Sequence, residues 1–503
     1  MRTFEQLQAD LGAAMAANRP GSGTPHVVIA LPSHSVGEAL LSHYGARVLA
    51  LEHRFLLSSL PTHRLPDAEW IYISSLAPTA EVVDYYRCLG PRPENFSSRT
   101  HVLSVDDHTP RSMAAKMLDR PELLDLIHEL VDGRVAVIEP WNVTDHEVAV
   151  AEALQLPLNG LDPRMLPLGF KSGGRRLFRQ AGVPVPFGVE DVRTVDDVVR
   201  GVKEIRAARP SATAVVVKHD DSGAGDGNVV LGLRELGHGG ADIGDDGNIL
   251  RARVNDLPDW YLAELRRGGI VEELLTGEEF TSPSAQIDLL PNGEVEVLAT
   301  HEQVLGGESG QVFLGCRFPA DPAYAGLLAR NAAVIGAALA EAGARGRASV
   351  DFAAVRSAEG TWQVYALEVN LRKGGTTHPY AVLRNLVPGK YDGLQGGWVA
   401  DADQLPRAYA CTDNLHDPAW LGLPAASVIS AVRDAGLEFD HRTGTGVVLH
   451  MLAGLGIDGR FGLTAIAPDA DAAQSSLDRT RDLVAATALG QVGSPAAGRS
   501  RGR

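Results

Sequence analysis

Short apolar runs alternate with amphipathic segments over the first third of the chain. Segments such as RPELLDLIHELV, at 120–131, show the period of a helix. Four other runs have the length and β-branched content of buried strands: HVVIAL at 26–31, WIYISS at 70–75, HVLSV at 101–105 and RVAVIEP at 134–140. This alternation predicts an α/β layer with a largely parallel sheet. None of the four runs is followed by G-x-G-x-x-G, so the pattern does not support a dinucleotide site.

Farther along the chain the pattern changes. A helix is predicted from Lys171 to Gln180, and the run AVVVKHD after it predicts a strand that ends in a glycine-rich loop. Two apolar runs at 447–452 and 461–467 flank Asp458-Gly459, which indicates a hairpin. Between these regions the sequence predicts a strand over 269–290, a loop-rich stretch over 305–321, a long alanine-rich helix from about Ala323 to Ala342, and strands around ASVDFAAV and WQVYALEVN.

These changes divide the chain into several units. A length of 503 residues allows three to four domains of roughly 150 residues each. The predicted division is an α/β domain at 1–165, two further units at 166–255 and 256–400, a small α/β domain at 401–489, and a disordered tail rich in Gly, Pro, Ser and Arg at 490–503.

Composition excludes several classes of protein. The chain has 46 basic and 63 acidic residues, a formal charge of −17, which argues against a nucleic acid or an anionic membrane as partner. No apolar run approaches the roughly 20 residues of a membrane span, and the N-terminus lacks the pattern of a signal peptide. The three cysteines lie far apart, so neither a disulfide framework nor a zinc site is indicated. We expect a cytoplasmic protein.

Only six of the 46 basic residues are lysines, and two of them stand at positions that could hold phosphate. Lys218 ends a predicted strand and is followed by Ser222, Gly223, Gly225 and Gly227, whose backbone N–H groups could approach phosphate oxygens closely. The alternative is a simple glycine-rich turn. Lys171 opens a helix, where a lysine is usually solvated, and the nearby Arg175 and Arg176 are interpreted as the wet face of that helix.

An acidic linker follows the next apolar run. Glu272, Glu273 and Leu275 lie in a segment whose backbone groups could meet the edge of an adenine ring. Glu279 lies a few residues on, where a carboxylate could accept hydrogen bonds from ribose hydroxyls. An exposed acidic turn is the alternative.

Two later strands carry a more specific pattern. Glu368 and Asn370 are two residues apart on one strand and so share a face, and Asp351 lies on the preceding strand. Carboxylate and amide oxygens of this kind suit Mg²⁺ that is shared with substrate phosphates. Arg372 and Lys373, followed by two glycines, could stabilise charge on a transferred phosphoryl group. For either strand alone, the solvated face of an antiparallel sheet remains an alternative.

Taken together and in this order, these features resemble the ATP-grasp superfamily over about Gly169–Gly375. One position departs from the pattern, because many members carry an arginine where this chain has Ser349, and Arg347 or Arg317 could substitute for it. The resemblance implies phosphate-binding lysines at Lys171 and Lys218, a mobile loop at Ser222–Asn228, an adenine hinge at Glu272–Leu275, a ribose carboxylate at Glu279, and Mg²⁺ ligands at Asp351, Glu368 and Asn370.

The stretches LEVNLRKGGTTHPYAVLRNLVPGKYD and THEQVLGGESGQVFLGCRFPAD, with a further domain behind them, are similar to the pheganomycin-type peptide ligases. That resemblance implies a Rossmann-like pre-ATP-grasp domain, a two-subdomain ATP-grasp core and a small C-terminal α/β domain. It also implies ATP- and Mg²⁺-dependent amide formation through an acyl phosphate, from a nonproteinogenic amino acid carboxylate and the amine of an amino acid or peptide, in secondary metabolism such as antibiotic biosynthesis. Lys218, Arg372 and Lys373 would then act in catalysis.

The substrate contacts and the reaction class stay open at this point. His301, Glu302 and Arg317 are candidates to line the substrate pocket, against the alternatives of a hydrogen-bonded structural histidine and a loop salt bridge. An ATP-grasp kinase or carboxylase, or a non-catalytic ATP-binding regulator, is the alternative to a ligase. The sequence does not name the substrates, and it leaves a homodimer open.

Overall fold

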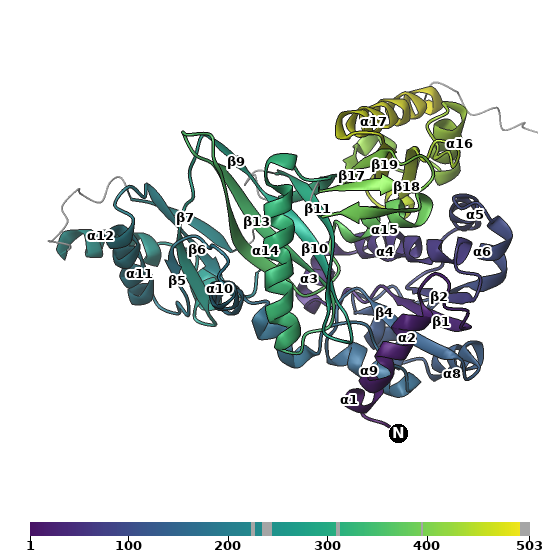
Figure 1. The fold of residues 1–503 in the computed structure, drawn as a ribbon, viewed down its shortest axis with the longest axis horizontal. Helices are drawn as coiled ribbons and strands as arrows, with labels where there is room; N and C mark the ends of the chain where they lie inside the picture. The colour runs from purple at the N-terminus through teal and green to yellow at the C-terminus, as the bar shows by residue number, and fades with distance from the viewer. Residues whose placement is uncertain (223–226, 234–243, 308–311, 394–395, 493–503) are drawn as a thin grey trace, which may run out of the picture.

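The computed structural model describes residues 1–222, 227–233, 244–307, 312–393 and 396–492, and Figure 1 shows their arrangement. The N-terminal part holds a four-stranded sheet in which all neighbours are parallel, as the sequence predicts. Its order is β3 (Thr100–Ser104), β2 (Ala68–Ser74), β1 (His26–Leu31) and β4 (Val135–Pro140).

Helices cover both faces of this parallel sheet, because its strands are apolar on both sides. The predicted helix at 120–131 is present as α8 (Pro121–Val131). The other helices of this part are α1 (Phe4–Leu7), α2 (Leu11–Ala17), α3 (Glu38–Tyr44), α4 (Arg47–Arg54), α5 (Ala80–Cys88), α6 (Pro93–Arg99), α7 (Met113–Leu118) and α9 (Asp145–Leu154).

A small lobe, on the left of Figure 1, is built on an antiparallel sheet. The predicted helix after residue 170 is confirmed as α10 (Lys171–Gln180). Buried valines such as Val199, Val215 and Val271 form the lobe's own core. The strand order is β5 (Gly188–Val189), β8 (Gly269–Glu273), β6 (Ala214–His219) and β7 (Asn228–Gly232), and the remaining helices are α11 (Val195–Ala208), α12 (Gly244–Asn255) and α13 (Asp259–Leu265).

The single strand predicted over 269–290 is wrong, because the chain passes there from one sheet to another. β8 pairs with β6 in the small lobe, whereas β9 (Glu279–Thr281) and β10 (Pro283–Leu289) pair with strand β13 (Gly346–Arg356) of a larger sheet. Gly277 lies at the crossing, where a Cβ would stand 2.4 Å from Cγ1 of Val355. The segment between β8 and β9 therefore joins the small lobe to the rest of the molecule.

The larger sheet has eleven strands and forms the centre of the molecule. The long alanine-rich helix is present as α14 (Pro322–Glu341) and packs with Leu328 and Ile335 against Ile287 of β10. The main path runs through β14 (Trp362–Asn370), β13, β10, β11 (Val295–Gly306), β12 (Val312–Phe318), β17 (Pro406–His416), β16 (Gly397–Ala400) and β15 (Gly389–Asp392).

Strand β12 lies in the stretch 305–321 that the sequence predicts as loop-rich, so that prediction is wrong. Its glycines suggest a loop, but Gly315 serves close strand pairing: a Cβ there would lie 2.1 Å from the carbonyl oxygen of Cys411. β12 joins β11 to β17, so the strands of the C-terminal segment continue the central sheet.

The predicted C-terminal hairpin is present as the antiparallel pair β18 (Gly446–His450) and β19 (Arg460–Ala467). Its connection is longer than a tight turn and contains the 3₁₀ segment Leu452–Gly456. Helices α16 (Ala425–Asp434) and α17 (Ala470–Val492) cover these strands, and α15 (Thr377–Leu386) follows β14. The tail predicted to be disordered from residue 490 starts inside α17, and 493–503 lie outside the described residues.

Within the described ranges, α14 is the one helix long and apolar enough to cross a membrane by length and composition. Half of its apolar window is buried, and its apolar side chains pack against the central sheet. We therefore explain its hydropathy by its place in the core.

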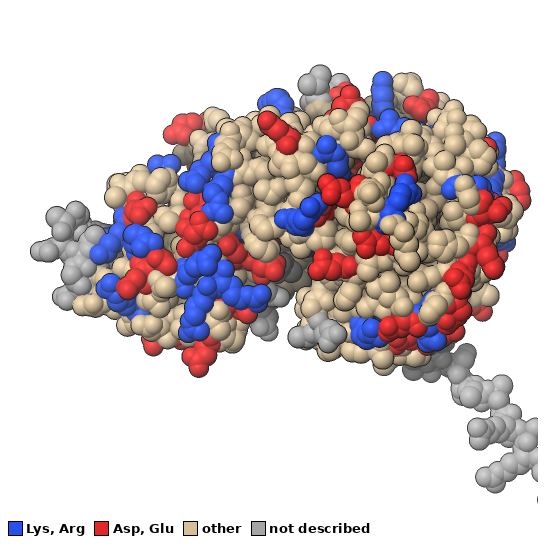
Figure 2. Space-filling view, turned by 90° about the horizontal axis from the view of Figure 1, so that it is seen from below, with Lys and Arg blue, Asp and Glu red and all other residues tan. Residues whose placement is uncertain are grey.

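Charged side chains of both signs are interspersed over the face drawn in Figure 2. On this face, the mixture gives no continuous basic surface of the kind that a nucleic acid or an anionic membrane would require.

Candidate active site

A cavity of ≈ 480 Å³ lies between the small lobe and the central sheet. Strands β6 and β8 form one wall, and strands β13 and β14 form the wall opposite. The cavity brings together nine residues that the sequence singled out: Lys171, Lys218, Glu272, Glu273, Leu275, Asp351, Glu368, Asn370 and Arg372.

The three predicted Mg²⁺ ligands face one another across β13 and β14. Asp351 is opposite Glu368 in the ladder, and its two carboxylate oxygens accept hydrogen bonds from Gln303 Nε2 at 2.8 Å and Asn370 Nδ2 at 3.1 Å. Burial, and after it the neighbouring Glu368 carboxylate, raises the pKa of Asp351 to about 7. Two neighbouring, partly buried carboxylates repel each other, and a divalent cation between them would relieve that repulsion. The donor set therefore fits Mg²⁺.

The two predicted phosphate lysines reach the cavity from the small lobe. Lys171 Nζ lies 3.1 Å from Glu368 Oε2 and donates to the carbonyl oxygen of Ser222 at 2.8 Å. Lys218 Nζ forms an ion pair with the Glu272 carboxylate. Both ammonium groups thus lie within reach of an anion in the cavity. Of the glycine loop, Ser222 and Gly227 are described, whereas Gly223 and Gly225 lie outside the described residues.

Arg372 enters the cavity from the end of β14. It is the one arginine among the described residues that line the cavity, and its guanidinium carbon lies 4.8 Å from the ring centre of Trp141. Burial lowers its pKa, with the carboxylates of Glu368 and Asp351 acting in the opposite direction. The Trp141 contact links the N-terminal domain to the site.

Arg175 is a residue that the sequence analysis misinterpreted. It is buried, and it donates to Glu272 Oε2 at 2.6 Å, to Glu190 Oε1 at 3.1 Å and to the Pro186 carbonyl oxygen at 2.8 Å. The Glu272 carboxylate is therefore held between Arg175 and Lys218, which fixes it as a partner of the lysine. Arg176 is exposed and pairs with Asp191, as expected of the solvent-exposed face of the helix.

A sequence signal for Arg175 was available. It follows Lys171 by four residues, so the two side chains share one face of α10. If Lys171 points into a site, Arg175 points the same way. The arginine's partner Glu272 is 97 residues farther along the chain, and no local pattern identifies that partner.

Several predicted site residues do not line this cavity. Glu279 pairs with Arg356 on an exposed part of the sheet, because β9 meets the far end of β13. Lys373 bonds to Glu139 at 3.0 Å and to the Pro140 carbonyl oxygen at 2.5 Å, which turns it toward the N-terminal domain. Arg317 is exposed, and its Nε donates to Gln474 Oε1 at 3.2 Å. Glu302 accepts from the Tyr324 hydroxyl at 2.6 Å.

His301 is a core residue. Its Nε2 lies 2.5 Å from the Tyr409 hydroxyl, and burial lowers its pKa to about 3, so the ring is neutral. The structural alternative thus describes His301, whereas Arg317 lies on strand β12 and forms neither the expected loop salt bridge with a described residue nor a contact with the first cavity. Arg347 pairs with Asp288 at 2.5 Å, and neither Arg347 nor Arg317 lines the first cavity. Neither residue therefore takes the place of the arginine that many ATP-grasp members carry where this chain has Ser349.

A second cavity, of ≈ 530 Å³, adjoins the first, and Gly374 lines both. Its walls come from the N-terminal domain, the central sheet and α15. Lys373 and Arg347 line this second cavity. A molecule held there would meet the first cavity at Gly374.

Comparisons with known proteins bear on the family and the fold. Residues 427–480 match a family model described as the PGM1 C-terminal domain. The chain is 32% identical over 431 residues to an L-propargylglycine–L-glutamate ligase of Streptantibioticus cattleyicolor, a match that covers 82% of this chain and 84% of the relative.

Two solved structures share the fold. The biotin carboxylase domain of Hydrogenobacter thermophilus 2-oxoglutarate carboxylase, in complex with MgADP, ADP and bicarbonate, has a TM-score of 0.51 at 13% identity and covers 92% of this chain and 89% of that one. Campylobacter jejuni biotin carboxylase, in complex with β,γ-ATP, has a TM-score of 0.53 at 14% identity. The match covers 93% of this chain and 95% of that one. The multidomain α/β architecture predicted from the sequence is confirmed.

Proposed function

This chain belongs to the ATP-grasp carbon–nitrogen ligases that include the L-propargylglycine–L-glutamate ligase, and on that premise we propose that it joins an amino acid carboxylate to an amine through an acyl phosphate. One observation carries the proposal: the oxygen ligands Asp351, Glu368 and Asn370 face two lysines of the small lobe across a single cavity. ATP and Mg²⁺ are the expected cofactors.

The residues of the cavity have distinct tasks in this proposal. Asp351, Glu368 and Asn370 would hold Mg²⁺, which when bound neutralises phosphate oxygens as charge moves during transfer. Lys171, Lys218 and Arg372 supply fixed positive charge around the same phosphates. The oxygen of a carboxylate is a poor leaving group. Phosphorylation by ATP converts it into phosphate, which leaves readily. The amine then attacks the carbonyl carbon, phosphate leaves, and the nitrogen loses one proton to solvent, which gives the amide.

We place the amino acid substrates in the second cavity. Four of its basic residues, Arg19, Arg54, Arg347 and Lys373, are each ion-paired with an acidic residue. Arg64 and Arg384 line the same cavity, and neither forms an ion pair with a described residue. Two such guanidinium groups favour an anionic ligand, and a substrate carboxylate is the obvious candidate.

Replacing Arg384 by alanine is expected to raise the KM for one amino acid substrate about tenfold to a hundredfold, because a hydrogen bond to a charged group contributes roughly 1.5–3 kcal/mol. The KM for ATP should stay unchanged. Steady-state kinetics with each substrate varied in turn measures both values. Arg330, exposed on α14, gives the matched control R330A, and equal effects of the two substitutions would contradict this assignment.

The reaction itself is tested by incubating the protein with ATP, Mg²⁺ and mixtures of amino acids, and by following products by mass. An amide formed with one ADP and one phosphate per bond supports the ligase. A phosphorylated acceptor without amide indicates a kinase, dependence on bicarbonate and biotin indicates a carboxylase, and ATP binding without turnover indicates a regulator.

We propose a cytoplasmic role in secondary metabolism, which agrees with the three free cysteines.

A further inference from the structure

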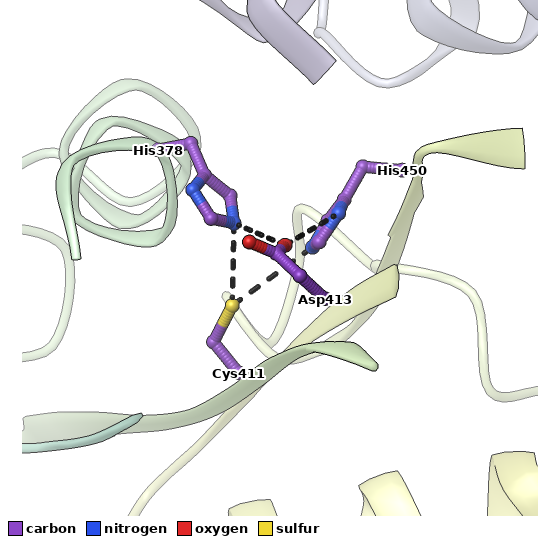
Figure 3. Close-up of side chains that lie close together, drawn as sticks. All are labelled: His378, Cys411, Asp413 and His450. Carbon is purple, nitrogen blue, oxygen red and sulfur yellow. Dashed lines mark hydrogen bonds and ion pairs between the residues drawn. The ribbon is translucent and has the colours of Figure 1, made fainter. Parts of the chain in front are cut away.

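A group of metal-ligand side chains adjoins the second cavity, which His378 lines, and lies apart from the proposed Mg²⁺ site. His378 comes from the first turn of α15, Cys411 and Asp413 come from β17, and His450 ends β18. Figure 3 shows the four side chains pointing toward one another. All four are buried, with at most 9% of any residue's surface exposed, and one ligand atom from each lies within 4.8 Å of the others.

The two distances from His378 Nε2 match the edges of a small coordination polyhedron, and each nitrogen of His450 lies near one of the other ligands. His378 Nε2 lies 3.4 Å from Cys411 Sγ and 3.2 Å from Asp413 Oδ1. His450 Nε2 lies 3.9 Å from the same sulfur, and His450 Nδ1 lies 3.4 Å from the same oxygen. A tetrahedral ion with bonds of roughly 2.0–2.3 Å to nitrogen, oxygen and sulfur requires ligand separations of about 3.3–3.8 Å.

Hydrogen bonds alone do not account for this arrangement. His378 Nε2 meets both the sulfur and the carboxylate, yet one ring nitrogen carries at most one proton. Asp413 Oδ1 and His450 Nδ1 are buried and have no hydrogen bond of good geometry to a described residue, although they lie 3.4 Å apart and His378 Nε2 lies 3.2 Å from Asp413 Oδ1. His450 turns Nε2 toward the sulfur and Nδ1 toward the Asp413 oxygen, whereas His378 turns one nitrogen toward both. Four potential metal-ligand atoms thus lie within 4.8 Å of one another, an arrangement that a cation between them would satisfy.

We propose that His378, Cys411, Asp413 and His450 bind a zinc ion. One sulfur, two imidazole nitrogens and one carboxylate oxygen form a donor set that zinc takes in tetrahedral geometry, and four protein ligands leave no open position, as in a structural site. On binding, the Cys411 thiol releases its proton to solvent and the thiolate bonds the metal. The other carboxylate oxygen of Asp413 pairs with Arg54 of α4, which fixes the orientation of the carboxylate.

The ion would join parts of the chain that only the fold brings together. It would connect α15 to two strands of the C-terminal segment, and Arg54 adds a contact from the N-terminal domain. Gly374, Gly375 and Thr376, which line the first cavity, directly precede α15. The zinc would therefore hold the start of α15 and, through it, the segment that carries Arg372. The isolated cysteines gave no sign of this site, because the two histidines lie 33 residues before and 39 residues after Cys411.

The test is the metal content of the full-length protein after zinc loading and gel filtration, measured by inductively coupled plasma mass spectrometry. We expect about one zinc per chain, a large loss in C411S and H450Q, and full retention in C316S. Cys316 is the matched control, because it is buried on β12 directly opposite Cys411 but is not one of the four ligands.

A second measurement does not depend on any variant folding. Cobalt added to the metal-free wild-type protein is expected to give the near-ultraviolet band of a thiolate-to-cobalt bond, and a chelator is expected to lower the melting temperature of the zinc-loaded protein. Wild-type protein that binds far less than one zinc and shows no thiolate band with cobalt would overturn the proposal. So would equal metal loss in C316S and C411S. Neither measurement uses ligase activity, so the outcome is separate from that of the proposed function.

Discussion

Replacing Glu368 by alanine is expected to lower kcat/KM for ATP-dependent turnover about 10³-fold, a loss of roughly 4 kcal/mol of transition-state stabilisation. Glu368 faces Asp351 across the β13–β14 ladder, and its Oε2 lies 3.1 Å from Lys171 Nζ. The substitution removes one proposed Mg²⁺ ligand and the carboxylate that positions a phosphate-binding lysine. Turnover is measured as ADP release at several Mg²⁺ concentrations, and the concentration for half-maximal rate should rise.

Glu294 supplies the matched control for this experiment, because it is an exposed glutamate in the turn between β10 and β11. The variant E294A should keep full turnover and an unchanged Mg²⁺ requirement. If E368A kept the wild-type rate and Mg²⁺ dependence, the assignment of β13 and β14 to the metal would be wrong.

The parts of the site that the sequence predicts are those in which one short segment carries the chemistry. Glu368 and Asn370 share a face because of strand alternation, and Lys218 ends a strand of uninterrupted apolar residues. Lys171 opens a helix at the point where the small lobe begins. The structure brings these side chains to one cavity, as the resemblance implies.

The errors arise where a side chain's partner is set by register between distant strands. Glu279 follows the hinge closely in sequence, but the crossing at Gly277 starts a new strand that pairs with β13 at Arg356, away from the cavity. His301 and Arg317 lie beside a motif in sequence, yet pairing of β11 with β12 and of β12 with β17 turns one toward the core and leaves the other exposed. Local patterns carry no information about such pairings.

Arg175 is another residue whose surroundings the local sequence does not reveal. An arginine on a helix is usually solvated, and nothing near it in sequence indicates that α10 is buried on this side. The structure encloses it between two glutamates and the Pro186 carbonyl oxygen. A guanidinium with 1% of its surface exposed is tolerated only because its donors have such partners.

Replacing Arg175 by methionine is accordingly expected to lower the free energy of unfolding by about 3 kcal/mol, because it leaves Glu190 and the Pro186 carbonyl without their buried donor and leaves Glu272 to Lys218 alone. R175K retains the charge but not the planar guanidinium, so its free energy of unfolding should lie between those of the wild type and R175M. Urea unfolding followed by circular dichroism measures the loss.

The neighbouring residue provides a control of the same size and charge. Arg176 is one position along the same helix, 44% exposed, and pairs with Asp191 at 2.5 Å in contact with solvent. Because an exposed ion pair contributes about 0–1 kcal/mol, R176M should barely change stability. Similar losses in R175M and R176M would mean that the buried contacts of Arg175 do not stabilise the lobe. A loss confined to R175M, with weaker ATP binding, would show that Glu272 needs Arg175 in order to hold Lys218 in place.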